Sequence, residues 1–185
     1  MKNHLPIEIV KVDLADIDPL IEISIDTFRE TFGGSNSADN MDKYIRESRS
    51  REKAVREFTT PGAEFYFAKT GTNDIIGYLK INTGRAQTEP LGDTFLEIER
   101  IYVLNRYHGQ KAGLQLMEFA LQRAREQHKQ TIWLGVWEHN IKAIQFYQKS
   151  GFVVFDKHSF MLGDDEQTDI MMRKELEKNI IFDPL

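Results

Sequence analysis

Glu97, Glu99 and Tyr147 are the residues whose types and positions best suit acid–base chemistry on an amine. Glu97 and Glu99 stand two positions apart in the apolar segment LEIERIYV, and Tyr147 lies in AIQFYQKSGF. A carboxylate in an apolar strand is costly to bury unless it has a partner or a catalytic task. A carboxylate can accept a proton from an ammonium group, and a phenol can donate one to a leaving group. These residues therefore suit the transfer of a chemical group to an amine.

The turn that follows LEIERIYV has the composition of an anion-binding loop. It holds Gly109 and Gly113, with Gln110 and Lys111 between them. Small residues let the backbone approach an anion, and a helix predicted from Ala112 onward adds the positive end of its dipole. The alternative is that the two glycines only shape a strand-to-helix turn, because short glycine patterns often match by chance.

Hydrophobic periodicity predicts the strands and helices that position these residues. Strands are predicted at 7–12, 64–70, 75–82, 95–103, 131–137, 152–155 and 169–174, and helices at 16–31, after Ser37, after Ser50, at 112–127 and at 141–150. This order indicates a mixed α/β sheet with helices on both faces, in one domain spanning residues 1–185.

Two details of this arrangement bear on the site. Side-chain alternation along 95–103 predicts that Glu97 and Glu99 share one face of a strand. The same alternation adds Ile101 and Val103 to that face. The segment 83–93, with two glycines and a proline, is predicted to be a loop that overhangs the site.

Composition narrows the class of protein. The chain has 185 residues, 41% of them hydrophobic and 29% charged, which is typical of one globular domain. No cysteine is present, so disulfides, thiolate metal sites and a cysteine nucleophile are excluded. A net charge of −5 argues against nucleic acid as a partner. The N-terminus lacks an apolar signal segment and no apolar run could span a bilayer, so we expect a cytoplasmic protein without a membrane partner.

Together these segments resemble the GCN5-related N-acetyltransferase (GNAT) superfamily. Its acetyl-CoA motif, Gln/Arg-x-x-Gly-x-Gly/Ala, aligns with residues 108–113. His108 replaces the Gln/Arg and Lys111 replaces the first glycine, while Gly113 fits the last position. Six segments between about residues 7 and 176 resemble the bacterial spermidine/spermine N-acetyltransferase branch, the PaiA type: SIDTFRETF, NMDKYI, LEIERIYV, IWLGVWEHN, AIQFYQKSGF and HSF-x-x-GDDEQTDI-x-M.

The resemblance implies a single-domain fold whose central mixed, mostly antiparallel sheet splays around acetyl-CoA as co-substrate, with no metal. It implies that the main chain of Ile101, Tyr102 and Val103 pairs with the pantetheine arm and holds the acetyl oxygen. The pyrophosphate would lie on the turn made by His108, Gly109, Gln110, Lys111, Ala112 and Gly113. Asn140 would cap its helix and contact the pantetheine or the pyrophosphate. Lys149 would neutralise a CoA phosphate, or serve only the dipole of its own helix.

The resemblance also implies direct transfer of the acetyl group to a primary amine of a polyamine such as spermidine or spermine. Tyr147 would protonate the CoA thiolate as general acid, unless it is only a core tyrosine. Glu99 would take the amine proton, through water, as general base. Glu97 is the second candidate, and an ion pair with Arg100 or Arg106 is the alternative in which neither glutamate acts.

The acceptor pocket is expected to include Phe28, Thr31 and Phe32 from the first long helix, together with Glu97 and His158. Phe28 and Phe32 are equally explained as core residues. His158 is interpreted as structural or substrate-facing, because the spacing of the histidines does not indicate a metal site.

Other interpretations stay open at this point. Trp133 and Trp137 share a strand face as core or site wall, with a cation–π contact to the substrate as the alternative. Asp164, Asp165 and Glu166 form a solvated turn or hold the distal ammonium of a polyamine. Rival acceptors are a protein N-terminus, a lysine side chain or an antibiotic amine, and a rival function is a CoA-binding regulatory sensor with poor turnover. A homodimer is expected from family habit alone.

Overall fold

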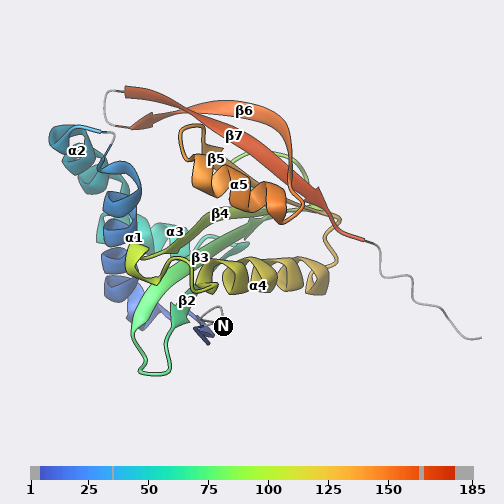
Figure 1. Cartoon of the computed structure of the whole chain (residues 1–185), viewed down its shortest axis with the longest axis horizontal. Coiled ribbons are helices and arrows are strands. Elements are labelled where there is room, and N and C mark those ends of the chain that lie inside the picture. The colour runs from blue at the N-terminus through green and yellow to red at the C-terminus, as the bar shows by residue number, and fades with distance from the viewer. Residues whose placement is uncertain (1–4, 35, 163–164, 178–185) are drawn as a thin grey trace, which may run out of the picture.

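The computed structural model describes residues 5–34, 36–162 and 165–177. These residues form one seven-stranded sheet and five α-helices (Figure 1). The strands are β1 (Glu8–Lys11), β2 (Ala63–Lys69), β3 (Ile75–Thr83), β4 (Phe95–Val103), β5 (Thr131–Trp137), β6 (Val153–Leu162) and β7 (Asp165–Glu175). The helices are α1 (Ile17–Phe32), α2 (Ala38–Ser48), α3 (Arg51–Phe58), α4 (Ala112–Glu126) and α5 (Ile141–Lys149). The predicted mixed α/β class is confirmed.

The sheet has the strand order β1-β2-β3-β4-β5-β7-β6. Among the strand pairs of the described residues, β4 and β5 run parallel and the other pairs run antiparallel. Helix α4 lies in the connection between β4 and β5, as a parallel pair requires a long crossover. The expected mixed, mostly antiparallel sheet is therefore confirmed.

The two parallel strands separate part-way along their length. They pair over four residues, from Phe95 opposite Thr131 to Ile98 opposite Leu134. Both strands then continue without pairing to each other, β4 to Val103 and β5 through Trp137. The edge of β4 that faces β5 therefore leaves backbone N–H and C=O groups available to a ligand, as the expected splay requires.

A β-bulge interrupts the side-chain alternation of β4. Arg100 pairs with Lys80 of β3, whereas Ile98 pairs with the next β3 residue, Ile81. Glu99 is therefore the extra residue, and a bulge of this kind shifts the alternation by one position.

The bulge makes one sequence-based prediction wrong. Glu97 and Glu99 both contact Asn82 and so lie on the same side of the sheet. Ile101 and Val103 instead pack against the core under α4, on the opposite face. Alternation counted along a single strand cannot locate a bulge, because the extra residue is defined by pairing with the neighbouring strand.

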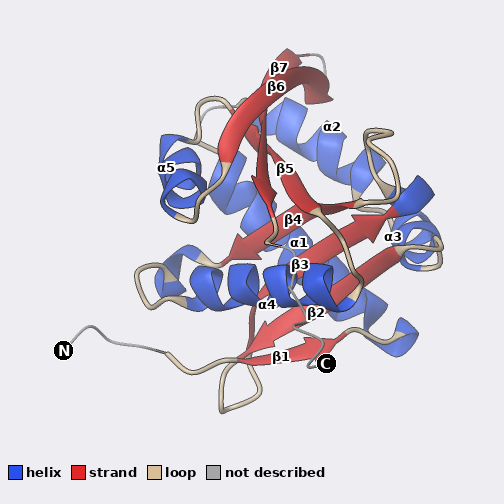
Figure 2. Ribbon diagram, turned by 90° about the vertical axis from the view of Figure 1, so that its right-hand side faces the viewer, coloured by secondary structure: helices blue, strands red, loops and turns tan. Residues whose placement is uncertain are grey.

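Helices cover both faces of the sheet (Figure 2). The first core cluster lies under α4 and α5, and the second lies under α1 and α3. A third cluster ties α1 and α2 to β5 and β6, and consists of Phe28, Phe32, Met41 and Trp137, with Phe160 packed against it. The described helices include none that is long and apolar enough to cross a membrane.

The helix ends follow the local signals in the sequence. Ser37, Ser50 and Asn140 each accept a hydrogen bond, with the side-chain oxygen, from the backbone N–H three residues later. Gly151 follows α5 with a φ of 88°, in the left-handed region that favours glycine. The predicted cap at Asn140 and the predicted helix starts after Ser37 and Ser50 are confirmed.

The C-terminal hairpin is longer than the sequence predicts. β6 extends to Leu162 and β7 begins at Asp165, whereas strands were expected only at 152–155 and 169–174. The residues between are mostly polar, so the hydrophobic pattern misses them, yet they pair with one another along the hairpin. Asp165 and Glu166 therefore begin a strand, and Asp164 lies outside the described residues. The hairpin reaches toward α2 (Figure 1).

Candidate active site

Four carboxylates and a histidine meet around one cavity of about 280 Å³. Glu99 and Gly135 line it, and they are the first residues past the last paired positions of β4 and β5. The cavity therefore lies where the two strands separate. Its charged lining consists of Glu89 from the β3–β4 loop, Glu97 and Glu99 from β4, His158 from β6 and Asp169 from β7. An acidic concave site of this kind favours a cationic ligand.

Glu97 is held by hydrogen bonds on both carboxylate oxygens and is only 2% exposed. Thr88 donates from its backbone N–H to Oε2 (2.9 Å) and from its hydroxyl to Oε1. Asn82 donates from Nδ2 to Oε2 (2.9 Å). Burial raises the pKa of the Glu97 carboxyl above its usual 4.5, and the hydrogen bonds from Thr88 and Asn82 offset only part of the rise.

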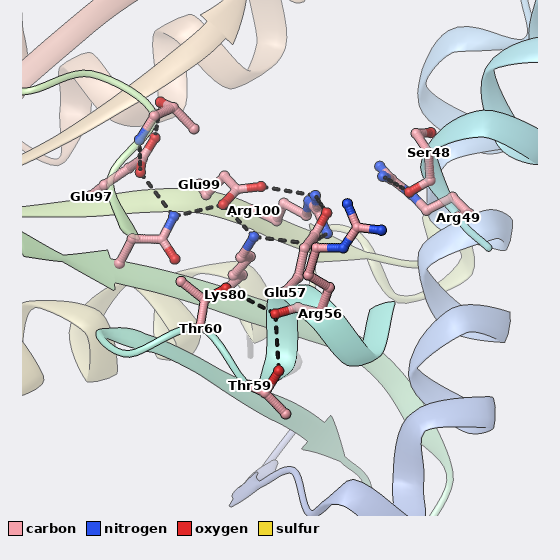
Figure 3. Close-up of polar contacts among 12 residues, drawn as sticks. Ser48, Arg49, Arg56, Glu57, Thr59, Thr60, Lys80, Glu97, Glu99 and Arg100 are labelled. Atoms are coloured by element: carbon pink, nitrogen blue, oxygen red, sulfur yellow. Dashed lines mark hydrogen bonds and ion pairs between the residues drawn. The ribbon is translucent and has the colours of Figure 1, made fainter. Parts of the chain in front are cut away.

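Glu99 belongs to a buried ion-pair network that joins α3, β3 and β4 (Figure 3). Its carboxylate lies 2.5 Å from Lys80 Nζ and 2.8 Å from Arg100 Nη2. Glu57 of α3 lies 3.0 Å from Lys80 Nζ and 2.8 Å from Arg100 Nη1. The ion pair between Glu99 and Arg100, which the sequence offered as an alternative, is therefore present. Arg106 instead lies over the ring of Tyr107.

This network gives Glu99 the opposite proton affinity to Glu97. Burial raises the pKa of Glu99, but the positive charges of Arg100 and Lys80 outweigh burial, so its pKa lies below the usual 4.5. A carboxylate with a lowered pKa is a weaker base. The pKa values of Glu97 and Glu99, two nearby carboxyls on one strand, are thus shifted in opposite directions by their surroundings.

Removing Glu57 from the network should destabilise the fold. Burial opposes ionisation of Glu57, but Arg100 and Lys80 lower its pKa from 4.5 to about 2. A carboxyl whose folded-state pKa is lowered stabilises the fold above its unfolded pKa of 4.5, and this contribution is lost as the pH falls toward 2. We expect Glu57→Gln to reduce the free energy of unfolding by about 3 kcal/mol at neutral pH.

Urea unfolding over a range of pH values measures this effect. The difference in the free energy of unfolding between the wild type and Glu57→Gln should shrink as the pH falls below about 4.5. Glu118 is exposed on α4 and provides a matched control, because Glu118→Gln should change the free energy of unfolding by less than about 0.5 kcal/mol. Equal stability of the wild type and Glu57→Gln at neutral pH would contradict the prediction.

His158 lies between two carboxylates in the cavity lining. Its Nδ1 is 3.1 Å from Glu89 Oε1, and its Nε2 is 3.5 Å from Asp169 Oδ2. Nδ1 is not aligned for a directed hydrogen bond to Glu89. Burial raises the pKa of Asp169, and His158 partly offsets the rise. Within the described ranges, no group of three or more His, Asp or Glu side chains is arranged so that it could hold a metal ion.

Tyr147 of α5 is buried beside the separated strands. The residue is 7% exposed, and its ring packs against Phe146 and Phe152. It belongs to the first core cluster together with Val136 of β5, and Ile101 and Val103 of β4 pack against the same cluster. Burial, followed by the negative charge of Asp169, raises the pKa of the phenol above its usual 10.0. Tyr147 is therefore a core tyrosine, as one interpretation held, and it also keeps its proton, as a general acid must.

The turn before α4 presents unpaired backbone donors. The N–H groups of Ala112, Gly113 and Leu114 have no partner within the described part of the chain. A Cβ placed on Gly113 would meet no neighbouring atom within 4 Å, so the helix start is open on that side. Together with the positive end of the α4 dipole, these donors fit a diphosphate group.

Three side chains of this turn have separate roles. His108 is exposed and donates from Nε2 to the carbonyl of Val103 (2.7 Å), which ties the turn to the end of β4. Gln110 donates to the carbonyl of Arg106 (3.2 Å), within the turn itself. Lys111 is exposed and immediately precedes α4, so its charge is available to an anion.

A sequence model of the Acetyltransferase (GNAT) family matches residues 20–152, a range that includes β4, the turn before α4 and Tyr147. The chain belongs to the GNAT family. An uncharacterized N-acetyltransferase of Lactobacillus delbrueckii subsp. lactis is 42% identical over 170 residues, which make up 92% of this chain and 98% of the relative. The spermidine N(1)-acetyltransferase of Thermoplasma acidophilum is 26% identical over 178 residues, 94% of this chain and 99% of the relative.

A solved structure agrees with the family. The crystal structure of PaiA N-acetyltransferase from Thermoplasma acidophilum in complex with coenzyme A has a TM-score of 0.73 and 25% sequence identity, and covers 93% of this chain and 100% of that chain. The predicted GNAT superfamily and fold are confirmed, and the protein is an N-acetyltransferase of that family.

The departure of this GNAT protein from the family motif has a structural cost at Lys111. Its φ of 65° lies in the left-handed region, which glycine adopts freely. A residue with a side chain pays about 1–2 kcal/mol there. In return, Lys111 brings a positive charge that the motif glycine cannot provide.

The other residues expected at the cofactor lie on β4 and α5. Ile101, Tyr102 and Val103 lie on the stretch of β4 beyond its last pair with β5. Asn140 caps α5 by accepting from the backbone N–H of Ala143 (3.2 Å). Lys149 is exposed in the last turn of α5. Their contacts with CoA stay predictions.

The residues expected from α1 at the acceptor pocket are mainly internal. Phe28 and Phe32 are 4% and 6% exposed and belong to the third core cluster, as the core interpretation held. Thr31 donates its hydroxyl to the carbonyl of Thr27 (2.8 Å). Trp137 joins the same cluster, while Trp133 is buried and donates from Nε1 to Gln87 (2.8 Å). Contact of these residues with substrate stays a prediction.

Sequence reasoning missed Thr88, Glu89, Asp169 and Lys80 as parts of this site. Thr88 and Glu89 stand in a loop without hydrophobic periodicity. Asp169 is one of several polar residues in β7, so its type alone does not single it out. Lys80 did carry a signal, because a lysine in the apolar strand segment IIGYLKI needs a buried partner.

Proposed function

We propose that this GNAT protein transfers the acetyl group of acetyl-CoA directly to a primary amine of a polyamine such as spermidine or spermine. The observation that carries the proposal is the cavity whose lining holds Glu89, Glu97, Glu99 and Asp169 together. A polyamine is a flexible chain of ammonium groups, and carboxylates at several points of one cavity complement such a chain.

The relatives support both the acetyl-CoA donor and the amine acceptor. The Thermoplasma acidophilum relative that spans almost all of this chain is named a spermidine N(1)-acetyltransferase. The similar solved structure from the same organism is a complex with coenzyme A. A shared family with these proteins favours an acyl-CoA donor and a small amine acceptor.

The residues of this chain fit acetyl-CoA. The unpaired N–H groups at the start of α4 suit its diphosphate, and the free edge of β4 beyond Ile98 suits the amides of its pantetheine arm. Acetyl-CoA supplies an activated acyl group when it is bound there. Because the chain has no cysteine, an enzyme thioester cannot form, and direct attack by the amine is the simplest route.

The acceptor amine must first lose a proton. At neutral pH roughly one amine in a thousand is the free base, a deficit of about 4 kcal/mol. We assign Glu97 as the proton acceptor, because it lines the cavity and burial raises its pKa. Glu99, which the family resemblance favours, is held by Lys80 and Arg100 and is kept as the second candidate.

The departing thiolate is the other charge that must be neutralised. Tyr147 is protonated and buried, and it shares a core cluster with residues from the separated ends of β4 and β5. We assign it as the general acid that returns a proton to sulfur. In the net reaction the ammonium nitrogen loses two protons and gains the acetyl group; one proton ends on the sulfur of CoA and the other is released to solvent.

A panel of amines tests the substrate class. Release of the CoA thiol should be fastest with spermidine or spermine, and kcat/KM should exceed that of a monoamine of similar length by about tenfold, because a second ammonium meets a second carboxylate. Glu89→Gln should lower kcat/KM for spermidine about two- to fivefold and leave the monoamine unaffected. Glu22→Gln, an exposed change on α1, should alter neither value.

Two results would redirect the proposal. Faster turnover of a peptide N-terminus, a lysine side chain or an antibiotic amine would assign a different acceptor to the same reaction. Tight binding of acetyl-CoA without product from any amine would indicate a regulatory sensor.

A further inference from the structure

The loop between β3 and β4 is braced by one of its own side chains. It turns at Gly84 and Gly92, whose φ values of 55° and 101° lie in the left-handed region. Gln87 donates from Nε2 to the carbonyls of Gly84 (3.3 Å) and Gly92 (3.0 Å). Its Oε1 accepts from Trp133 Nε1 (2.8 Å), which fixes the loop to β5. The residue that follows this brace is therefore held in place.

That residue is Thr88, which lines the cavity and holds Glu97 with two donors. Its backbone N–H reaches Oε2 (2.9 Å), and its hydroxyl reaches Oε1. Asn82 adds a third donor to Glu97 and also donates to Glu99 Oε2 (2.6 Å). A carboxylate that is 2% exposed has little water to replace any of these donors.

We propose that Thr88 is a positioning residue for acetyl transfer: its hydroxyl orients the Glu97 carboxylate in the cavity and stabilises the ionised form of that carboxylate. The inference rests on the proposed role of Glu97 as proton acceptor. A donated hydrogen bond stabilises the charged form, so its loss leaves burial to favour the protonated form. A protonated Glu97 cannot accept the proton of the amine.

Replacing the hydroxyl isolates this one contribution. Thr88→Val keeps the side-chain shape and the backbone N–H that donates to Glu97. Among the described residues, it also leaves in place the charged or titratable groups around the carboxylate. Glu89 in the loop, Glu99 on β4, His158 on β6 and Asp169 on β7 share the cavity lining, and Lys80 on β3 and Arg100 on β4 pair with Glu99.

Carbon-13 NMR of side-chain-labelled enzyme measures the Glu97 titration directly, with the signal assigned through Glu97→Gln. We expect Thr88→Val to raise the titration midpoint of Glu97 by about one pH unit and Thr88→Ser to restore it. An unchanged midpoint in Thr88→Val would overturn the proposal. This measurement needs no substrate, so it decides the role of Thr88 even if every amine fails as acceptor, a result that would count against the proposed function instead.

The pH dependence of turnover provides the second readout, with whichever amine reacts fastest. In Thr88→Val the acidic limb of the profile of kcat/KM against pH should shift to higher pH by about one unit. At pH values below the limb, kcat/KM should fall about tenfold, and on the plateau it should not change. Thr72 donates its hydroxyl to Asp74 (2.6 Å) outside the cavity lining, so Thr72→Val is a matched control that should leave the profile unchanged. A uniform loss at all pH values, without a shift, would show a purely structural role and overturn the proposal.

Discussion

Glu97→Gln should lower kcat/KM for the acceptor amine by about 10²- to 10⁴-fold at neutral pH. Glutamine keeps the size of the side chain and can still accept hydrogen bonds from Thr88 and Asn82. It cannot take a proton from an ammonium group, so only the small free-base fraction of the amine would react. Steady-state kinetics of CoA-thiol release measures the loss, and thermal unfolding checks that the variant is folded.

Glu99→Gln is the matched control on the same strand. It removes ion pairs with Lys80 and Arg100, so the free energy of unfolding should fall. Turnover of the folded variant should fall by less than about tenfold, because Glu97 still accepts the proton. A greater kinetic loss in Glu99→Gln than in Glu97→Gln would instead assign the base to Glu99, as the family resemblance implies.

The pH profile separates the two carboxylates further. The base must be ionised to act, so kcat/KM of the wild type should rise as the pH increases through the pKa of the acting carboxyl. The pKa of Glu97 is raised above 4.5 by burial, and that of Glu99 is lowered below 4.5 despite burial. An acidic limb above 4.5 that disappears in Glu97→Gln identifies Glu97, whereas a limb below 4.5 points to Glu99.

The fold follows from the sequence because its strands and helices bury distinct periodic faces. The helix at 17–32, the strands at 63–69 and 75–83 and the α5 cap at Asn140 all carry local signals of hydrophobic spacing or hydrogen bonding. The bulge at Glu99 carries no such signal. It depends on the register with β3, which is a property of two strands together.

The site follows from the sequence only in part, for the same reason. Glu97 and Tyr147 are visible as chemically capable residues in apolar segments. Glu89 and Asp169 become site residues only because the β3–β4 loop and strand β7, which pairs with β5, bring them to the cavity that Glu97 and Glu99 line. The difference between Glu97 and Glu99 arises from partners distant in the chain, such as Glu57 on α3 acting through Lys80. Composition of one strand cannot predict which of its carboxylates is basic.

Tyr147→Phe should lower kcat by about ten- to a thousandfold with little change in the affinity for acetyl-CoA. The ring keeps its packing against Phe146 and Phe152, and its hydroxyl has no hydrogen-bond partner within the described residues. The free energy of unfolding should therefore change by less than about 1 kcal/mol. The lost step is protonation of the thiolate, and its cost is limited because a thiol of pKa about 8.5 is already a tolerable leaving group.

Tyr66→Phe is the matched control for this loss. Tyr66 is also a buried core tyrosine, but its hydroxyl donates to Glu64, away from the cavity lining, so its removal should leave kcat unchanged. Because burial raises the pKa of Tyr147 above 10.0, the wild type should show no alkaline loss from this residue up to that pH. Single-turnover kinetics with bound acetyl-CoA isolates the chemical step, and a wild-type rate in Tyr147→Phe would leave this tyrosine with a packing role alone.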